Sequence, residues 1–290
     1  MQTLLPALGF VGTGVMGKSM IGHLLKAGYP VRVHNRTKSK AEALLQQGAT
    51  WAETHGDTAR DADVVLTIVG HPSDVQSVYL GKGGILDQMK GGGTVIDLTT
   101  SSPSLAREIH QKATEKGVSS LDAPVTGGDV GAREARLVIM VGGDKDAFEK
   151  ARPILEKLGK TISHMGGAGS GQHCKLCNQI MIAGTMLGMS EGLVYARKSG
   201  LDPQQVLSTI GGGAAGSWAL NNLAPRILKG DLEPGFTIEH FVKDMGLALE
   251  ECQRMNVRLP GLELVRKLYD SLQDKGYSRK GTQALIKELE

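Results

Sequence analysis

Lys175 is the residue of this chain whose surroundings most strongly indicate chemistry. A charge-free stretch rich in Met, Leu, Ile, Ala and Gly follows it as far as Glu191, as is typical of a buried helix. Burying an ammonium costs several kcal/mol unless it is paired or lies beside a ligand. The alternative is that the side chain of Lys175 extends along the helix and places its amine in water. Asn178 and Gln179 follow three and four residues later and share one helical face with it. We expect a long helix over residues 170–199 that presents Lys175 to a cleft between two domains.

A glycine-rich turn near the N-terminus is the second candidate site. An apolar, strand-like segment over residues 7–11 leads into this turn, and a helix is expected over residues 16–27. A G-x-G-x-x-G pattern between a strand and a helix is the fingerprint of a dinucleotide-binding unit. Its glycines allow a tight turn and close approach of a pyrophosphate to the backbone, at the positive end of the helix dipole. The residues expected to bind the cofactor here are Gly12, Gly14, Val15, Met16 and Gly17.

The end of the next expected strand, residues 31–34, indicates which cofactor binds. A unit that binds NAD usually carries Asp or Glu at this place, to hold the ribose 2′-hydroxyl. This chain has Asn35, Arg36 and Thr37 instead, and a guanidinium can bind a 2′-phosphate bidentately. The sequence therefore predicts NADP(H) in preference to NAD(H). The alternative is a solvated arginine in a turn.

Three later strand ends carry groups suited to cofactor or substrate. Val69 closes an expected strand over residues 63–69, next to a loop that should line the cofactor cleft. The hydroxyls of residues 99–102 follow another strand; one of them can contact the nicotinamide, or they serve as an N-cap before Pro103. The turn formed by Thr126, Gly127 and Gly128 offers a hydroxyl and open backbone N–H groups to a substrate carboxylate. The alternative for that turn is a plain strand ending.

These candidates must be positioned by two domains. Expected strands and helices alternate up to residue 165, which predicts an α/β fold with an N-terminal, Rossmann-type doubly wound sheet in an NADP-binding domain, 1–165. Residues 166–290 are expected to form an all-helical C-terminal domain, joined to the first by the long helix. Within it, Gly211–Trp218 is expected to be a flexible loop. Trp218 either closes over the substrate or packs in the core.

Composition excludes several classes of function. The chain of 290 residues is 40% hydrophobic and 22% charged with a net charge of +3, which argues against a nucleic-acid-binding surface. The apolar segment after Lys175 is shorter than a membrane span, and residues 1–6 do not resemble a signal peptide. An odd number of cysteines, three, favours reduced thiols and a cytoplasmic location. Cys174 and Cys177 lack the second ligand pair of a zinc site, so we expect two small buried side chains and no metal.

Four motifs, in the same order and along essentially the whole chain, resemble the β-hydroxyacid dehydrogenase family. This family includes 3-hydroxyisobutyrate dehydrogenase and the tartronate semialdehyde, glyoxylate and succinic semialdehyde reductases. The motifs are residues 9–17, residues 122–128, residues 169–175 and the pair Lys243-Asp244. Family members commonly carry Ser at the place of Thr126, so the hydroxyl is kept and a methyl group is added.

The resemblance implies a role for each matching residue. Lys175 would be the general acid/base, and either Asn178 or Gln179 would orient it; many members have Asn at the place of Gln179. Lys243 would reach the cofactor from the helical domain, although its residue type alone suggests a surface charge, as for Asp244. Thr100 would lie near the nicotinamide.

The expected function is that of an NADP-dependent oxidoreductase. It would transfer a hydride between NADP(H) and a short 3-hydroxy acid or aldehyde acid, similar to 3-hydroxyisobutyrate. Alternatives are the reduction of glyoxylate, succinic semialdehyde or tartronate semialdehyde. Imine reductases usually lack the lysine, a non-catalytic NADP-binding module would not need it, and 6-phosphogluconate dehydrogenase is a larger protein. A homodimer or homotetramer through the helical domain is expected.

Overall fold

The computed structural model describes residues 5–290 of the chain. Residues 1–4, which belong to the segment compared with a signal peptide above, lie outside the described residues. Contacts divide the chain into two compact units, Met1–Lys175 and Leu176–Glu290. The division falls inside a helix, further along the chain than residue 165, where we expected the boundary. No helix in the described part is both long enough and apolar enough to cross a membrane.

The first unit alternates strands with helices. Its strands are β1 (Leu8–Val11), β2 (Val31–His34), β3 (Thr50–Trp51), β4 (Val64–Thr67), β5 (Thr94–Asp97), β6 (Ser119–Asp122), β7 (Val125–Thr126), β8 (Leu137–Gly143) and β9 (Gly159–Gly166). Its helices are α1 (Val15–Lys26), α2 (Glu42–Leu45), α3 (Pro72–Leu80), α4 (Ile85–Gln88), α5 (Pro103–Glu115), α6 (Gly128–Arg133) and α7 (Lys145–Leu155), with short 3-10 turns at Lys38–Ala41 and Gly56–Thr58.

Within the described residues these strands form one sheet, in the order β3-β2-β1-β4-β5-β6-β8-β7, with β9 paired to β8. The six strands from β3 to β6 are all parallel, whereas β8 runs antiparallel to β6. The chain adds β2 and β3 on one side of β1, then β4, β5 and β6 on the other. The order therefore reverses between β1 and β4, and open sheets of this kind bind ligands at such a reversal. The predicted Rossmann-type fold is confirmed.

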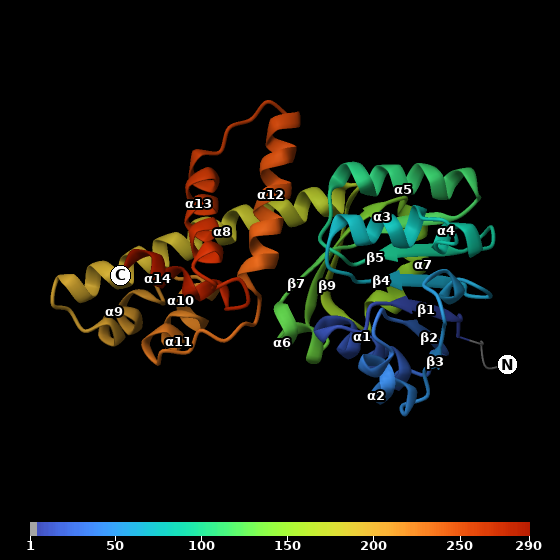
Figure 1. Ribbon diagram of the computed structural model, residues 1–290, viewed down its shortest axis with the longest axis horizontal. Helices are drawn as coiled ribbons and strands as arrows, with labels where there is room; N and C mark the ends of the chain where they lie inside the picture. Colours follow the sequence, from blue (N-terminus) through green and yellow to red (C-terminus); the bar gives the residue numbers. More distant parts are fainter. Residues whose placement is uncertain (1–4) are drawn as a thin grey trace. The chain divides into compact units, whose positions relative to one another are not determined.

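Helices cover both faces of this sheet. Figure 1 shows α3, α4 and α5 together over one face. On that side Val65 and Val95 of the sheet belong to the same buried cluster as Tyr79 and Ile109 of the helices. The other face carries α1 and α7 in a separate buried cluster. Two-sided burial explains why β1, β4 and β5 are buried along their whole length, without the alternation of a half-exposed strand.

The elements differ from the sequence-based expectations mainly at short segments. β3 and β7 have two residues each, too few to produce a periodic pattern. After Thr37 the chain forms a 3-10 turn followed by a single α-helical turn. Pro72 begins α3 shortly after β4 ends at Thr67, in a segment where only a loop was expected. Asp74 stabilises the start of α3, because its Oδ2 accepts a hydrogen bond from the backbone N–H of His71 at 3.1 Å.

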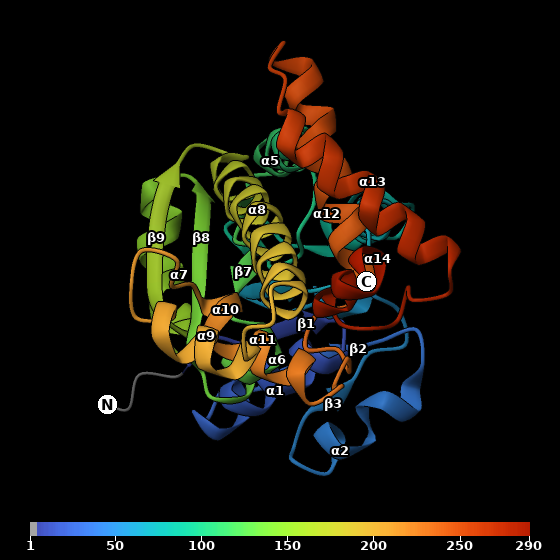
Figure 2. The ribbon, with the colours of Figure 1, turned by 90° about the vertical axis from the view of Figure 1, so that its left-hand side faces the viewer.

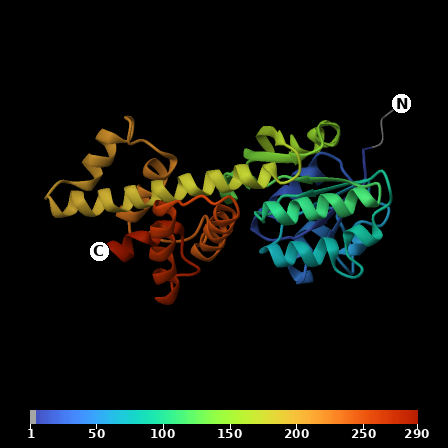
Figure 3. The ribbon, with the colours of Figure 1, turned by 90° about the horizontal axis from the view of Figure 1, so that it is seen from above.

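Helix α8 (Ser170–Lys198) is one unbroken helix that begins in the first unit and continues into the second (Figure 3). The second unit also contains α9 (Pro203–Ile210), α10 (Trp218–Asn222), α11 (Ala224–Leu228), α12 (Ile238–Arg254), α13 (Pro260–Asp274), a 3-10 turn at Thr282–Leu285 and α14 (Ile286–Leu289). Figure 2 shows α12 and α13 side by side, with α14 close to them. Phe241 and Tyr269 join α12 to α13, with their rings edge to face and 5.2 Å apart. Helix α14 follows α13 after the 3-10 turn at Thr282–Leu285.

Candidate functional site

The carboxyl ends of the central strands place four residues in one row across the sheet. Val11 of β1 pairs with Thr67 of β4, Thr67 with Asp97 of β5, and Asp97 with Asp122 of β6. The loops that follow these residues leave the sheet at the same edge. The predicted cofactor residues Gly12, Val69 and Thr100 therefore extend from one edge of the first unit.

The three glycines of the fingerprint have distinct roles. A Cβ at Gly12 would lie 2.0 Å from the carbonyl oxygen of Ile68, and the φ of Gly12 is +104°. A Cβ at Gly17 would lie 2.0 Å from the carbonyl oxygen of Gly12, so both glycines are required by the packing of the protein itself. Gly14 has no heavy atom within 4 Å of its Cβ position. Because packing does not require Gly14, its bare backbone fits a site where a pyrophosphate approaches the start of α1.

Asn35 connects the glycine-rich loop to the loop after β2. Its Oδ1 accepts a hydrogen bond from the N–H of Thr13 at 3.2 Å, and its Nδ2 donates to the carbonyl of Thr37 at 3.0 Å. The buried Oγ1 of Thr13 has no hydrogen-bond partner among the described residues, which fits a bound polar group beside it. The side chain of Arg36 is 85% exposed, with Nη1 3.4 Å from Asp74 Oδ1. An exposed pair of this kind contributes little, so the guanidinium remains accessible to a phosphate.

Asp97 joins the loops after β4 and β5. Its Oδ1 accepts hydrogen bonds from the hydroxyl of Thr67 at 2.8 Å and the N–H of Thr99 at 3.0 Å, and Thr99 Oγ1 accepts one from the N–H of Val69 at 3.0 Å. Burial raises the pKa of Asp97 to about 6; the hydrogen bonds from Thr99 and Thr67 act in the opposite direction, and the nearby Asp122 raises it further. The predicted cofactor residues Val69 and Thr100 thus flank a buried, hydrogen-bonded network.

Asp122 fixes the start of α8. Its Oδ1 accepts a hydrogen bond from the N–H of Gly169 at 2.7 Å, and its Oδ2 accepts one from the N–H of Gln172 at 2.8 Å. These N–H groups have no partner within a helix, and a carboxylate is favourable at this end of the helix dipole. Burial raises the pKa of Asp122, while the same hydrogen bonds oppose the rise. A Cβ at Gly171 would lie 2.4 Å from the carbonyl oxygen of Met140, so this glycine lets the helix approach the sheet.

Lys175 lies in the second turn of α8, and its side chain is buried, with the residue 6% exposed. Because Asp122 holds the first turn of α8, the backbone of Lys175 has a fixed position relative to the carboxyl ends of β5 and β6. A buried lysine can transfer a proton to or from a bound small molecule. The first turn of the helix that carries Lys175 is bonded to Asp122 and to the loop after β5; the presentation of Lys175 to a cleft between two domains stays a prediction.

The turn predicted to hold a substrate carboxylate follows β7. Thr126 pairs with Val138 of β8, and Gly127 and Gly128, at the start of α6, adopt φ values of +126° and +64°. Positive φ values favour glycine at both positions. Successive N–H groups in such a turn can face an anion, and the binding of a substrate carboxylate at this turn stays a prediction.

Gln179 and Lys243 belong to the second unit, where Asp244 connects them. Gln179 Nε2 donates a hydrogen bond to Asp244 Oδ2 at 2.7 Å, and Lys243 Nζ lies 3.1 Å from Asp244 Oδ1. Asn178 Nδ2 donates to Gln179 Oε1 at 2.6 Å. The side chain of Asp244 is only 2% exposed and that of Lys243 13%. Their simplest interpretation as surface charges is therefore wrong, because they form a buried ion pair that also binds an amide.

Trp218 and the cysteines complete the predicted positions. Trp218 is the first residue of α10 and is 69% exposed, which rules out the alternative of a core tryptophan within the described chain. Cys177 is exposed, so the expectation that both cysteines of the C-x-x-C pair are buried is wrong for Cys177. Met181, one helical turn later on the same face of α8, is also exposed. In residues 5–290, no group of three His, Cys, Asp or Glu side chains could hold a metal ion.

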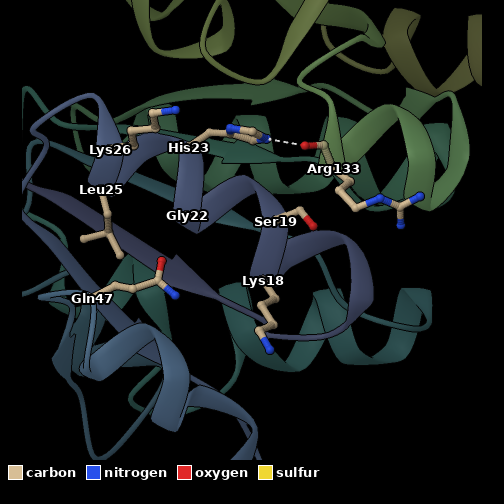
Figure 4. A pocket seen from close by; sticks show the side chains of 8 residues that line it. All are labelled: Lys18, Ser19, Gly22, His23, Leu25, Lys26, Gln47 and Arg133. Atoms are coloured by element: carbon tan, nitrogen blue, oxygen red, sulfur yellow. Dashed lines mark hydrogen bonds between the residues drawn. The ribbon is translucent and has the colours of Figure 1, made fainter.

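A hollow of about 610 Å³ lies along α1 in the first unit, and none of the predicted site residues lines it. Figure 4 shows His23 of α1 reaching the carbonyl of Arg133; its Nε2 lies 3.0 Å from the carbonyl oxygen of Ala132 and 3.1 Å from that of Arg133. His23 thus connects the fingerprint helix to the end of α6, the helix that begins at the Thr126–Gly128 turn.

Three polar residues of the sheet edge, Asp97, Asp122 and Gln172, carry no role in the sequence-based predictions. Asp97 and Asp122 could have been recognised from the sequence, because each is a charged residue at the end of a strand that is otherwise uncharged. Gln172 precedes Lys175 by three residues, the spacing of neighbours on one helical face. Buried polar groups in such positions require hydrogen-bond partners, and those partners are the loops of the candidate site.

Comparisons with known proteins match both units. Residues 7–167 match the family described as the NAD binding domain of 6-phosphogluconate dehydrogenase, and residues 169–289 match the NAD-binding domain of NADP-dependent 3-hydroxyisobutyrate dehydrogenase. An uncharacterized oxidoreductase of Bacillus subtilis (strain 168) is 54% identical, with 97% of each chain covered. A probable mitochondrial 3-hydroxyisobutyrate dehydrogenase-like protein of Arabidopsis thaliana is 51% identical over 98% of this chain and 85% of its own.

Two further proteins of named activity are similar along their whole length. The 2-hydroxy-3-oxopropionate reductase of Escherichia coli (strain K12) is 36% identical, with 98% of this chain and 97% of its own covered. The structure of Mycobacterium tuberculosis 3-hydroxyisobutyrate dehydrogenase with L-serine superposes with a TM-score of 0.91 at 30% identity, covering 98% and 99% of the two chains. Sequence motifs, fold and relatives agree, and the chain belongs to the β-hydroxyacid dehydrogenase family.

Proposed function

We propose that this protein is an NADP-dependent oxidoreductase acting on a short 3-hydroxy acid or the corresponding aldehyde acid, similar to 3-hydroxyisobutyrate. The observation that carries the proposal is the buried Lys175 in the second turn of α8, whose first turn is held by Asp122. In reduction, the ammonium of Lys175 donates a proton to the carbonyl oxygen of the substrate and stabilises the developing negative charge. In oxidation, its amine accepts the proton of the hydroxyl. When bound, NADP(H) supplies or takes up the hydride.

One amide is proposed to orient Lys175. Asn178 and Gln179 follow it by three and four residues in the same continuous helix, so both fall on its face of α8. Gln179 is the buried member of the two and is itself fixed by Asp244. We favour Gln179 for this reason.

The preference for NADP(H) rests on the loop after β2. This loop carries Arg36 and lacks the carboxylate that would repel a 2′-phosphate. The family matched by the second half of the chain is also described as NADP-dependent. The residues proposed to bind the cofactor are Gly12, Gly14, Val15, Met16 and Gly17 at the pyrophosphate, Asn35, Arg36 and Thr37 at the ribose phosphate, and Val69, Thr100 and Lys243 towards the nicotinamide.

The proposed substrate anchor is the turn of Thr126, Gly127 and Gly128, which would bind a carboxylate and so orient the reacting carbonyl. Trp218 is proposed as a further substrate contact. A second candidate substrate is 2-hydroxy-3-oxopropionate, also called tartronate semialdehyde, because the reductase named for it is 36% identical to this chain. Glyoxylate and succinic semialdehyde remain alternatives of the same chemical class.

Assembly and location are also proposed. We propose a homodimer or homotetramer through the helical unit, because α8 exposes Met181 and Tyr195 on the second unit, each 73% accessible. We propose a cytoplasmic location because the chain has an odd number of cysteines, none of which is in a disulfide within the described residues.

The test is a matrix of two cofactors and several substrates. Oxidation of NADPH and of NADH is measured with methylmalonate semialdehyde, tartronate semialdehyde, glyoxylate and succinic semialdehyde, and reduction of NADP+ with 3-hydroxyisobutyrate and L-serine. We expect turnover with NADPH well above that with NADH, with one of the three-carbon-backbone aldehyde acids as the best substrate. Binding of NADPH without turnover of any of these acids would contradict the proposal and favour an imine reductase or a non-catalytic NADP-binding module.

A further inference from the structure

The side chain of Gln172 joins two parts of the candidate site. It lies in the first turn of α8 and is 0% exposed. Its Oε1 accepts a hydrogen bond from the N–H of Ser101 at 2.9 Å, and its Nε2 donates one to the carbonyl of Thr99 at 2.8 Å. Both partners are backbone groups of the loop after β5, and they flank Thr100.

Gln172 is not needed to hold the start of α8, because Asp122 already does so through the N–H groups of Gly169 and Gln172. Its amide has a separate effect: it fixes the position of the loop after β5. A planar amide binds a backbone N–H and a backbone carbonyl at once, as a neighbouring strand would. Without it, two buried backbone groups would lose their hydrogen-bond partners, which is unfavourable for a loop held in one position.

Lys175 follows Gln172 by three residues, so the two side chains lie on neighbouring positions of one helical face. The loop containing Thr100 and the backbone of Lys175 are thereby connected through less than one turn of rigid helix. We propose that Gln172 is a positioning residue that sets the distance between the loop at the nicotinamide end of the cofactor and the acid/base Lys175. This inference rests on the proposed function. A misplacement of about 1 Å between reacting groups can cost on the order of 100-fold in rate.

The test compares two substitutions of similar volume. Gln172→Met removes both hydrogen bonds, whereas Gln172→Glu retains them only while the new carboxyl is protonated, since the neutral acid both donates and accepts. Burial and the neighbouring Asp122 raise the pKa of a glutamic acid at this place. Gln111→Glu, on the exposed face of α5, is the matched control.

We expect Gln172→Met to lower kcat on the order of 100-fold, with a much smaller change in the Kd of NADPH and an increased kinetic isotope effect when the transferred hydride is deuterium. The ratio of kcat of Gln172→Glu to that of the wild type should rise as the pH falls, in one and the same folded protein. A residue with a purely structural role would change the unfolding midpoint without the isotope effect or the pH-dependent recovery.

The outcomes separate the two proposals. A wild-type enzyme that turns over none of the aldehyde acids would overturn the proposed function and this inference with it. An active wild type whose Gln172 variants keep its kcat, its isotope effect and its pH profile would overturn the inference alone.

Discussion

Gln179 Nε2 lies 2.7 Å from Asp244 Oδ2, and both residues are only 1% exposed. The amide of Gln179 is therefore committed to a buried carboxylate, and its carbonyl oxygen accepts a hydrogen bond from Asn178. This arrangement makes the two adjacent amides unequal, although the sequence alone left them equivalent. Asn178 is half-buried, and within the described residues its side chain donates a hydrogen bond to Gln179.

The first prediction concerns these amides. Gln179→Ala removes a hydrogen-bond donor from a buried carboxylate and should lower the free energy of unfolding by about 2–3 kcal/mol. Asn178→Ala should cost less than about 1 kcal/mol, because its side chain is partly solvated. Urea unfolding of both variants at pH 7 measures the difference. Equal losses for the two would show that Asp244 does not depend on Gln179.

The second prediction concerns Lys175. Lys175→Ala should lower kcat by about 10²- to 10⁴-fold, the usual contribution of general acid–base catalysis, and should leave the Kd of NADPH within a few fold. Steady-state kinetics and NADPH fluorescence titration measure the two quantities. Lys198→Ala, at the exposed end of the same helix, serves as the control. A Lys175→Ala enzyme with wild-type turnover would remove the lysine from the mechanism.

The third prediction separates two glycines of one fingerprint. Gly12→Ala should destabilise the fold by about 3 kcal/mol, because its Cβ would lie 2.0 Å from a carbonyl oxygen in a left-handed backbone conformation. Gly14→Val should leave the unfolding free energy within about 0.5 kcal/mol, since nothing lies within 4 Å of its Cβ position. The same variant should weaken NADPH binding at least about tenfold. Normal NADPH affinity in Gly14→Val would mean that no pyrophosphate approaches this residue.

The fourth prediction concerns the choice of cofactor. Arg36→Ala should raise the KM for NADPH about tenfold, the equivalent of one charge-assisted hydrogen bond, and should leave the KM for NADH nearly unchanged. Arg258→Ala, on the second unit and with an 80% exposed side chain, controls for the loss of a surface charge. If both KM values rose equally, Arg36 would act on a part common to the two cofactors and not on the 2′-phosphate.

Most of the fold and part of the site could be predicted from the sequence. The strand–glycine–helix order and the residue types after each strand are local features, so the doubly wound sheet and the candidate loops could be predicted from them. Lys175 stands out because a charged residue is rare in a helix whose other residues are mostly apolar. These inferences needed no knowledge of which distant residues meet.

The remaining features depend on contacts between residues far apart in the chain. Gln172 meets Thr99 and Ser101 only because α8 begins beside the end of β5, and Asp244 is buried only because α12 presents it to Gln179. A charged pair within a polar segment, such as Lys243-Asp244, has the same pattern whether it is solvated or paired inside. Residue type and spacing therefore cannot distinguish the two cases.

The fifth prediction concerns Asp97 and pH. Burial raises the pKa of Asp97 from 3.8 to about 6 in the folded protein, so between these values the folded state binds more protons than the unfolded chain. The contribution of Asp97 to stability is therefore present below about pH 4 and is lost as the pH rises through about 6, by about 3 kcal/mol in all.

Asp97→Asn retains an acceptor for Thr67 and Thr99 but removes this titration. The stability advantage of the wild type over Asp97→Asn, measured by urea unfolding at a series of pH values, should consequently fall between pH 4 and pH 7. Asp61→Asn is the control, because the hydrogen bond from Lys90 lowers the pKa of the exposed Asp61. The stability advantage of the wild type over Asp61→Asn should therefore rise, not fall, with increasing pH. Parallel curves for the wild type and Asp97→Asn would mean that Asp97 titrates alike in the folded and unfolded chains, and that the network between β4 and β5 does not hold its proton.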